Sequence, residues 1–227
     1  AVGYDAGNDI TTGVQNTLVG GTAGDAVTTG TRTVAVGYNA GGGITTGDSN
    51  VAIGYQALMT EDAHSNNVAV GASALQTQNA GAHAYNTAVG FEAGKAITTG
   101  IYNTAVGANT LLANTTGASN NAFGYGALTA NTTAAYNNAF GINALAANTT
   151  GASNSAFGHT ALDNNIDGGS NSAFGANALD ANTTANYNSA FGADSLQSNT
   201  TGAGNTGIGQ GALNANTTAS NNTAVGY

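Results

Sequence analysis

Residues that could bind a metal ion gather at one place in the sequence. His64 and His83 lie near each other, and Glu61 and Asp62 come just before the first of them. Imidazole and carboxylate groups are common ligands of divalent transition metals. The same residue types are typical of a solvated, irregular loop, and we favour that interpretation. We therefore predict no metal site.

Other residues give little indication of catalysis. The stretch "GFEAGKA" (90–96) faintly resembles a phosphate-binding loop, but it is one residue short and has Ala96 where a hydroxyl is needed. His159 stands at a variable position and is expected at the surface. The sequence has no paired acids and no nucleophile–base set. We predict that the protein is not an enzyme and has no catalytic residue and no cofactor.

The composition excludes several classes of partner. Charged residues make up only 6% of the chain, the net charge is −9, and Arg32 and Lys95 are the only fixed cations. A nucleic-acid partner is excluded because a phosphate backbone requires a basic surface. No apolar run approaches the roughly 18 residues that a membrane span needs. Cysteine is absent, so no disulfide can stabilise the fold.

The dominant feature is a strict repeat around the motif Ala-(Val/Phe/Ile)-Gly. Its glycines, which we call the reference glycines, define thirteen intervals, of which twelve are 17 residues and one, between Gly71 and Gly90, is 19. The reference glycines are Gly3, Gly20, Gly37, Gly54, Gly71, Gly90, Gly107, Gly124, Gly141, Gly158, Gly175, Gly192, Gly209 and Gly226.

A period of 17 residues is too short for helical hairpin repeats or propeller blades, which need roughly 33 to 50 residues. It suits one coil of a β-solenoid, whose coils stack about 4.8 Å apart. We predict an all-β fold, a parallel β-solenoid of about 13 coils that forms a single domain over residues 1–227. The longer interval predicts a two-residue insertion near residues 76–85.

Two columns of the repeat are expected to be structural ladders. Four residues before the reference glycine stands a corner asparagine, which suits a turn and can hydrogen-bond from coil to coil. Directly before the glycine stands an apolar residue, which is phenylalanine in five successive coils and which we expect to stack in a core or interface. The central members are Asn103, Asn120, Asn137, Asn154, Asn171 and Asn188, and Phe123, Phe140, Phe157, Phe174 and Phe191.

Two further positions compensate for each other. When the fourth residue after the reference glycine is leucine, as at Leu145, the seventh is asparagine in most coils; when the fourth is glycine, as at Gly41, the seventh is aliphatic, as at Ile44. A packed core conserves its volume. Both positions should therefore reach the same interior.

The strand itself has two faces without charge. Alternate residues point to opposite sides of a strand, so one face carries alanine and glycine and the other carries valine or phenylalanine. A strand that is restricted on both faces is usually covered on both. We expect one face to line the coil's interior and the Ala/Gly columns to pack against a second chain.

Three surface features could bind ligands. Tyr85, Tyr102, Tyr136 and Tyr187 precede corner asparagines and could contact a glycan, although covering small residues is the simpler role. Threonine pairs follow the reference glycine by eight and nine residues in ten of thirteen coils, which raises an ice-binding alternative; only one of each pair can face outward. The "NTT" tripeptides match the glycosylation pattern, but the repeat alone explains them.

The stretches "NVAIG" (50–54), "NVAVG" (67–71) and "NSAFG" (154–158) resemble the head repeats of YadA-like trimeric autotransporter adhesins, and the unit with "NTTG" resembles repeats of phage tail-fibre proteins. The resemblance implies a left-handed solenoid that packs side by side as a homotrimer. It also implies an extracellular location, at a cell surface or on a virion tail fibre.

From the resemblance we expect a structural shaft or adhesin segment of a fibre. Its partners would be copies of itself and, in addition, a host-surface glycan or receptor. Because both ends of the sequence fall within the repeat, we also expect the chain to be an excerpt of a longer array.

Overall fold

The computed structural model describes residues 1–81 and 83–227, which form strands and turns and no helix. The chain is a parallel β-solenoid of about 12 turns with 17-residue coils, as predicted from the period. It divides into two compact units, Ala1–Ala118 and Ser119–Tyr227.

Each coil contributes one strand of three residues. The first unit contains β1 (Thr17–Val19), β2 (Val34–Val36), β3 (Val51–Ile53), β4 (Val68–Val70), β5 (Thr87–Val89) and β6 (Thr104–Val106). The second contains β7 (Asn121–Phe123), β8 (Asn138–Phe140), β9 (Ser155–Phe157), β10 (Ser172–Phe174), β11 (Ser189–Phe191), β12 (Thr206–Ile208) and β13 (Thr223–Val225).

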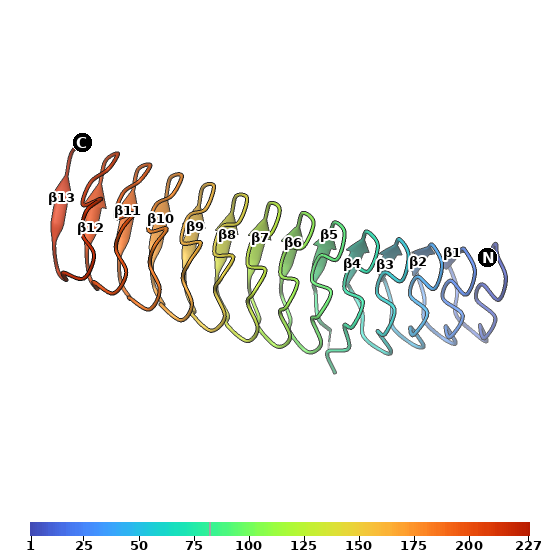
Figure 1. Ribbon diagram of the computed structural model, residues 1–227. Helices are drawn as coiled ribbons and strands as arrows, with labels where there is room; N and C mark the ends of the chain where they lie inside the picture. The colour runs from blue at the N-terminus through green and yellow to red at the C-terminus, as the bar shows by residue number, and fades with distance from the viewer. Residues whose placement is uncertain (82) are drawn as a thin grey trace. The chain divides into compact units, whose positions relative to one another are not determined.

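Within each unit the strands pair in chain order and in parallel, as Figure 1 shows. Each residue pairs with the equivalent residue of the next coil, so that Ala139 in β8 faces Ala156 in β9. The register also holds across the insertion, where Ala69 in β4 pairs with Ala88 in β5. The two extra residues therefore lie outside the strands, and we call residues 72–81 and 83–90 the insertion coil.

The reference glycines are required by the backbone. Gly124 has φ of 124°, a conformation that L-residues with side chains rarely adopt. A β-carbon at this position would lie 2.5 Å from the carbonyl oxygen of Gly141 in the next coil. Strict spacing of glycine in the sequence thus reflects both a φ requirement and close contact between stacked backbones.

The interior of most coils is lined by the alanine at the centre of the strand, which is replaced by Leu18 in β1 and Gly207 in β12. Ala139 and Ala156 have no exposed surface within the single chain. Our prediction that the Ala/Gly columns pack against a partner chain is therefore wrong: these alanines fill the solenoid's own core. The faces are reversed because the turns after the strand fold the second half of each coil over the alanine side.

The expected compensation between the fourth and seventh positions is confirmed. Leu145 and Ile44 are both fully buried. A β-carbon on Gly94 would lie 2.9 Å from Cδ1 of Ile97, so the aliphatic residue at the seventh position occupies the space of the missing side chain. Either position supplies one large aliphatic group to the same interior.

Candidate functional site in the polar network at the insertion

Most corner asparagines bind the backbone of the next coil, and Asn222 also donates to the side chain of the corner Asn205 at 3.1 Å. The Nδ2 of Asn137 donates to the carbonyl oxygen of Gly151 at 2.9 Å, and its Oδ1 accepts from the backbone N–H of Asn154 at 2.9 Å. Both asparagines are fully buried. A regular corner amide such as that of Asn137 therefore satisfies two backbone groups that a sharp turn would otherwise leave buried without partners.

A second asparagine ladder runs through the seventh position after the reference glycine. The Nδ2 of Asn165 donates to Oδ1 of Asn148 at 2.8 Å and to the carbonyl oxygen of Gly168 at 2.8 Å. Asn148 and Asn182 begin "NTT" tripeptides, yet both are fully buried with their amides engaged. In the folded coil these amides are not available as glycosylation acceptors.

The corner ladder changes its acceptor at the insertion. In a regular coil the corner asparagine donates to the carbonyl 14 residues further on, as Asn50 does to His64 at 2.8 Å. Asn67, which precedes the insertion coil, instead donates its Nδ2 to Oε2 of Glu61 at 3.3 Å. Glu61 stands at the seventh position, where most coils with leucine at the fourth carry asparagine. The longer acidic side chain thus replaces an acceptor that the regular repeat takes from the backbone.

Glu61 is buried in this network. Its Oε1 forms a hydrogen bond with Nδ1 of His64 at 2.8 Å and accepts from the His64 backbone N–H at 3.3 Å. The side chain of Glu61 has no exposed surface, whereas that of His64 is 18% exposed. Burial raises the pKa of Glu61, and the contacts with His64 oppose this shift. Our interpretation of this stretch as a solvated loop is wrong for Glu61.

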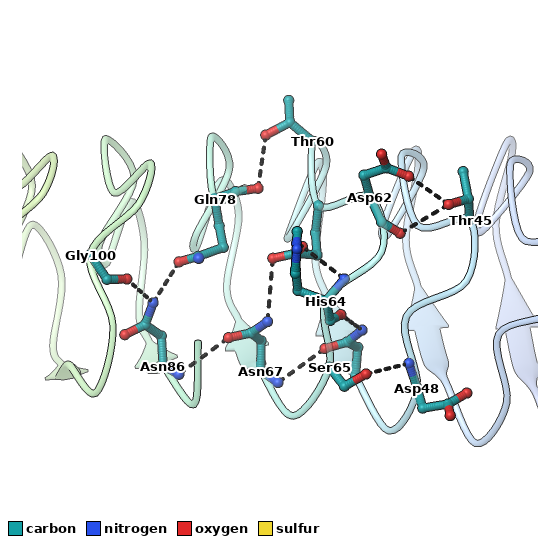
Figure 2. A network of polar contacts seen from close by, with 12 residues as sticks. Thr45, Asp48, Thr60, Asp62, His64, Ser65, Asn67, Gln78, Asn86 and Gly100 are labelled. Carbon is teal, nitrogen blue, oxygen red and sulfur yellow. Dashed lines mark hydrogen bonds and ion pairs between the residues drawn. The ribbon is translucent and has the colours of Figure 1, made fainter. Parts of the chain in front are cut away.

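Gln78 provides a side-chain acceptor to a corner asparagine, as Glu61 does. Its Oε1 accepts from Nδ2 of Asn86 at 2.6 Å, while the same amide donates to the carbonyl of Gly100 at 2.7 Å (Figure 2). Gln78 is fully buried, and its Nε2 has no hydrogen-bond partner. Glu61 and Gln78, the two long polar residues at the seventh position, therefore each accept from a corner asparagine near the insertion, Asn67 and Asn86.

The other residues of the candidate metal site lie apart from Glu61's carboxylate. Asp62 accepts from the hydroxyl of Thr45, and His83 is exposed and contacts the ring of Tyr85 edge-on. Among residues 1–81 and 83–227, no group of three or more His, Cys, Asp or Glu side chains is placed to hold a metal ion. The chemistry that this network offers is hydrogen bonding and proton exchange.

The phenylalanine column stacks on the outward side of the second unit. Successive rings lie 4.6–5.0 Å apart and are parallel to within 10°. These side chains are half-exposed, unlike the alanines beside them, and Phe191 is 42% exposed. In the first unit the same column holds valine and isoleucine, and Ile53 is 37% exposed. We call this column, directly before the reference glycines, the strand-end column.

The tyrosines do not form one continuous row. Tyr85 and Tyr102 stack with ring centroids 5.7 Å apart in the first unit. Tyr136 and Tyr187 belong to the second unit, are separated by three coils and are exposed. Sequence reasoning missed another exposed pair, Tyr38 and Tyr55, which stack at 5.7 Å; the signal was the residue directly after the reference glycine.

In most threonine pairs one residue is exposed and the other is partly buried; both residues are exposed in Thr11 and Thr12 and in Thr217 and Thr218. The hydroxyl of Thr149 donates to the carbonyl oxygen of Ile166 at 3.1 Å in the next coil, whereas Thr150 is exposed. Thr183 and Thr184 repeat this arrangement. The exposed threonines therefore make a single column in each unit.

The fold and these ladders define a β-solenoid repeat protein. Comparisons with protein-family models, with curated proteins and with solved structures found no match. In the part of the chain that the structure describes, no helix is both long and apolar enough to cross a membrane. The resemblance to adhesin heads and tail-fibre repeats stays a prediction.

Proposed function

We propose that the chain is a non-catalytic structural segment of an extracellular fibre, either a phage tail fibre or a bacterial surface adhesin. The observation that carries the proposal is the strand-end column, an apolar and uncharged row that is half-exposed along both units. Contiguous exposed apolar surface of this kind is typical of interaction sites. A repeat that extends without charge along one face suits lateral packing of long identical chains.

The partner that fits this row is a second copy of the same chain. Identical solenoids in register bring each strand-end residue opposite an equivalent residue, so every coil adds the same contact. The interface we propose therefore uses Ile53, Phe157 and their equivalents, and not the buried alanines. From the resemblance to adhesin heads we propose that three copies associate and that each solenoid is left-handed.

Immunogold electron microscopy tests the location. Antibodies raised against the chain should label filaments on the outside of the source cells or on tail fibres of released virions. Label confined to the cytoplasm would contradict the proposal.

Glycan contact is the function we assign to the exposed tyrosines. The stacked pair of Tyr85 and Tyr102 offers exposed aromatic surface to a sugar ring. A glycan array tests this: binding that Tyr102→Ala removes and Tyr38→Ala retains would support it. Silence of the wild-type chain would leave the segment a purely structural part of the fibre.

Ice binding is a second candidate, supported by the exposed threonine column of Thr150, Thr184 and their equivalents. The regular spacing of stacked coils resembles a lattice, although one column is narrower than the two-column face expected for this function. Thermal hysteresis with ice shaping at micromolar protein would favour this candidate over the fibre.

A further inference from the structure

Glu61 is unusual among the charged residues of this protein. In residues 1–81 and 83–227 it is the one charged side chain with no exposed surface. Removing a carboxylate from water is costly unless the charge is paired and hydrogen-bonded. The pairing group is His64, whose Nδ1 lies 2.8 Å from Oε1 and whose ring keeps 18% of its surface in contact with solvent. The pair can therefore exchange protons although the carboxylate is buried.

A proton on this pair satisfies both partners. When the Glu61 carboxyl donates its O–H to Nδ1 of neutral His64, the pair carries no net charge and the hydrogen bond is satisfied. When the pair loses this proton, a negative charge remains in the interior without a positive partner. The buried pair should thus hold a proton more tightly in the folded coil than in the unfolded chain.

The surrounding charges do not replace His64 in this role. Asp62 on the same coil is negative and bonds Thr45. Asp48 on the preceding coil accepts from Thr31 and lies 3.8 Å from the exposed Arg32. His83 on the following coil is exposed and stands against Tyr85. Among these groups, His64 is the one whose side chain contacts the Glu61 carboxyl.

The position of the pair gives its protonation a structural consequence. Glu61 holds the amide of Asn67 in place of a backbone carbonyl, and Oδ1 of Asn67 accepts from the backbone N–H of Asn86 at 3.2 Å across the insertion coil. Gln78 beside Asn86 already has one buried N–H without a partner. The network at the insertion coil therefore depends on Glu61 more than any regular coil depends on a charged group.

We propose that the Glu61–His64 pair is a proton-dependent lock on the insertion coil, which is held more tightly when the pair carries a proton and opens more readily as the pH rises. This goes beyond a passive structural role, since it gives the solenoid one pH-sensitive point. The raised pKa of Glu61, caused chiefly by burial, has the matching sign. Its contribution to stability is complete below the unfolded value of 4.5 and is lost as the pH rises through the folded value.

Carbon-13 NMR of the wild-type chain tests the lock directly. The sequence has only two glutamates, Glu61 and Glu92, so selective labelling of glutamate gives two side-chain carboxyl signals, which Glu92→Gln assigns. We expect the Glu61 signal to titrate at a higher pH than glutamate in the urea-unfolded chain. A midpoint at or below that of the unfolded chain overturns the proposal, and this readout needs no variant of Glu61 that folds.

Hydrogen exchange measures how readily the insertion coil opens as the pH changes. The backbone N–H of Asn86, which donates to Asn67, is compared with that of Asn154, which makes the same bond in a regular coil. After correction for intrinsic exchange, the opening constant at Asn86 should rise between pH 5 and pH 8 by about tenfold for each unit by which the Glu61 midpoint is raised. The constant at Asn154 should change by less than about twofold.

Glu61→Gln removes the titrating group and Glu92→Gln is the matched control. The first variant should lose the pH dependence at Asn86 and the second should keep it. The proposal is overturned if wild-type Asn86 shows no more pH dependence than Asn154, or if Glu61→Gln retains the wild-type dependence.

Discussion

Ile44 fills the space that a side chain on Gly41 would take: a β-carbon on Gly41 would lie 3.0 Å from Cδ1 of Ile44. Gly41 has φ of 57°, and Leu145, at the equivalent position of another coil, has φ of 55°. The backbone is thus the same left-handed turn in both kinds of coil. In one kind leucine reaches the core from this turn at some conformational cost, and in the other the aliphatic group comes from three residues later.

The first prediction converts a coil that has leucine at the fourth position into a coil that has an aliphatic residue at the seventh. Leu145→Gly alone should destabilise the fold by about 2 kcal/mol or more, because it leaves a cavity in the core. Asn148→Ile alone should cost about 1–3 kcal/mol through crowding against Leu145 and lost amide bonds. The double variant should be more stable than the sum of the single effects by about 1 kcal/mol. Urea unfolding of the four proteins measures this coupling, and strict additivity would contradict the shared interior.

The second prediction concerns the reference glycines. Gly124→Ala should destabilise the fold by about 3 kcal/mol or more, because the new methyl group would meet the carbonyl of Gly141 at 2.5 Å in a disfavoured backbone conformation. Gly21→Ala is the control, since its β-carbon would make an ordinary 3.4 Å contact with the ring of Tyr38. Thermal unfolding should separate the two variants clearly; equal stabilities would refute the packing argument.

The third prediction uses two neighbouring residues to separate an effect on folding from an effect on assembly. Ala156 is fully buried inside the coil, so Ala156→Glu should unfold the repeat by leaving an unpaired carboxylate in the core. Phe157 faces outward and is half-exposed, so Phe157→Glu should keep the β-rich circular dichroism spectrum and lose self-association. An assembled, folded Ala156→Glu protein would show that the alanine face is not the interior.

The fourth prediction uses Asp163, whose pKa is raised by burial and by the neighbouring charge of Asp180. A raised pKa means that its stabilising contribution is present below about pH 3.8 and is lost as the pH rises. Asp163→Asn should therefore stabilise the fold at pH 7 by roughly 0.5 kcal/mol, a small effect because solvent screens the charges, and should have no effect at pH 3. The exposed Asp167, changed to Asn, controls for net charge. A gain from Asp163→Asn that persists at pH 3 would rule out this electrostatic cause.

Much of the fold could be predicted from the sequence because stacking imposes the same requirement on every coil. The reference glycines, the corner asparagines such as Asn137 and the exchange between Leu145 and Ile44 positions all repeat at fixed spacing. Each of these requirements comes from a backbone angle, a buried amide or a conserved volume, so each leaves a visible mark in the sequence.

The sequence could not predict which face of the strand points into the core. Alternation shows that Ala139 and Phe140 point to opposite sides, but neither side is charged, so the pattern does not tell inside from outside. Size was the misleading feature: the larger residue was assigned to the interior. The turn that follows the strand instead supplies the large core residue from Leu145, which leaves room only for alanine on the strand.

The buried polar network of Glu61 and Gln78 could not be predicted for a different reason. Glu61 and His64 are close in the sequence, and acids beside histidines are usually solvated. The useful signal was the column: Glu61 and Gln78 stand at the seventh position, which is buried in the coils with leucine at the fourth from Leu111 to Leu196. Reading each residue by its place in the coil would have predicted their burial.

Light scattering of the wild-type chain in solution tests the proposed self-association through the strand-end column most directly. The account predicts a mass of three times 21.9 kDa that Phe157→Glu reduces to one times this value. A clean mass of 21.9 kDa for the wild-type chain at high concentration would contradict it.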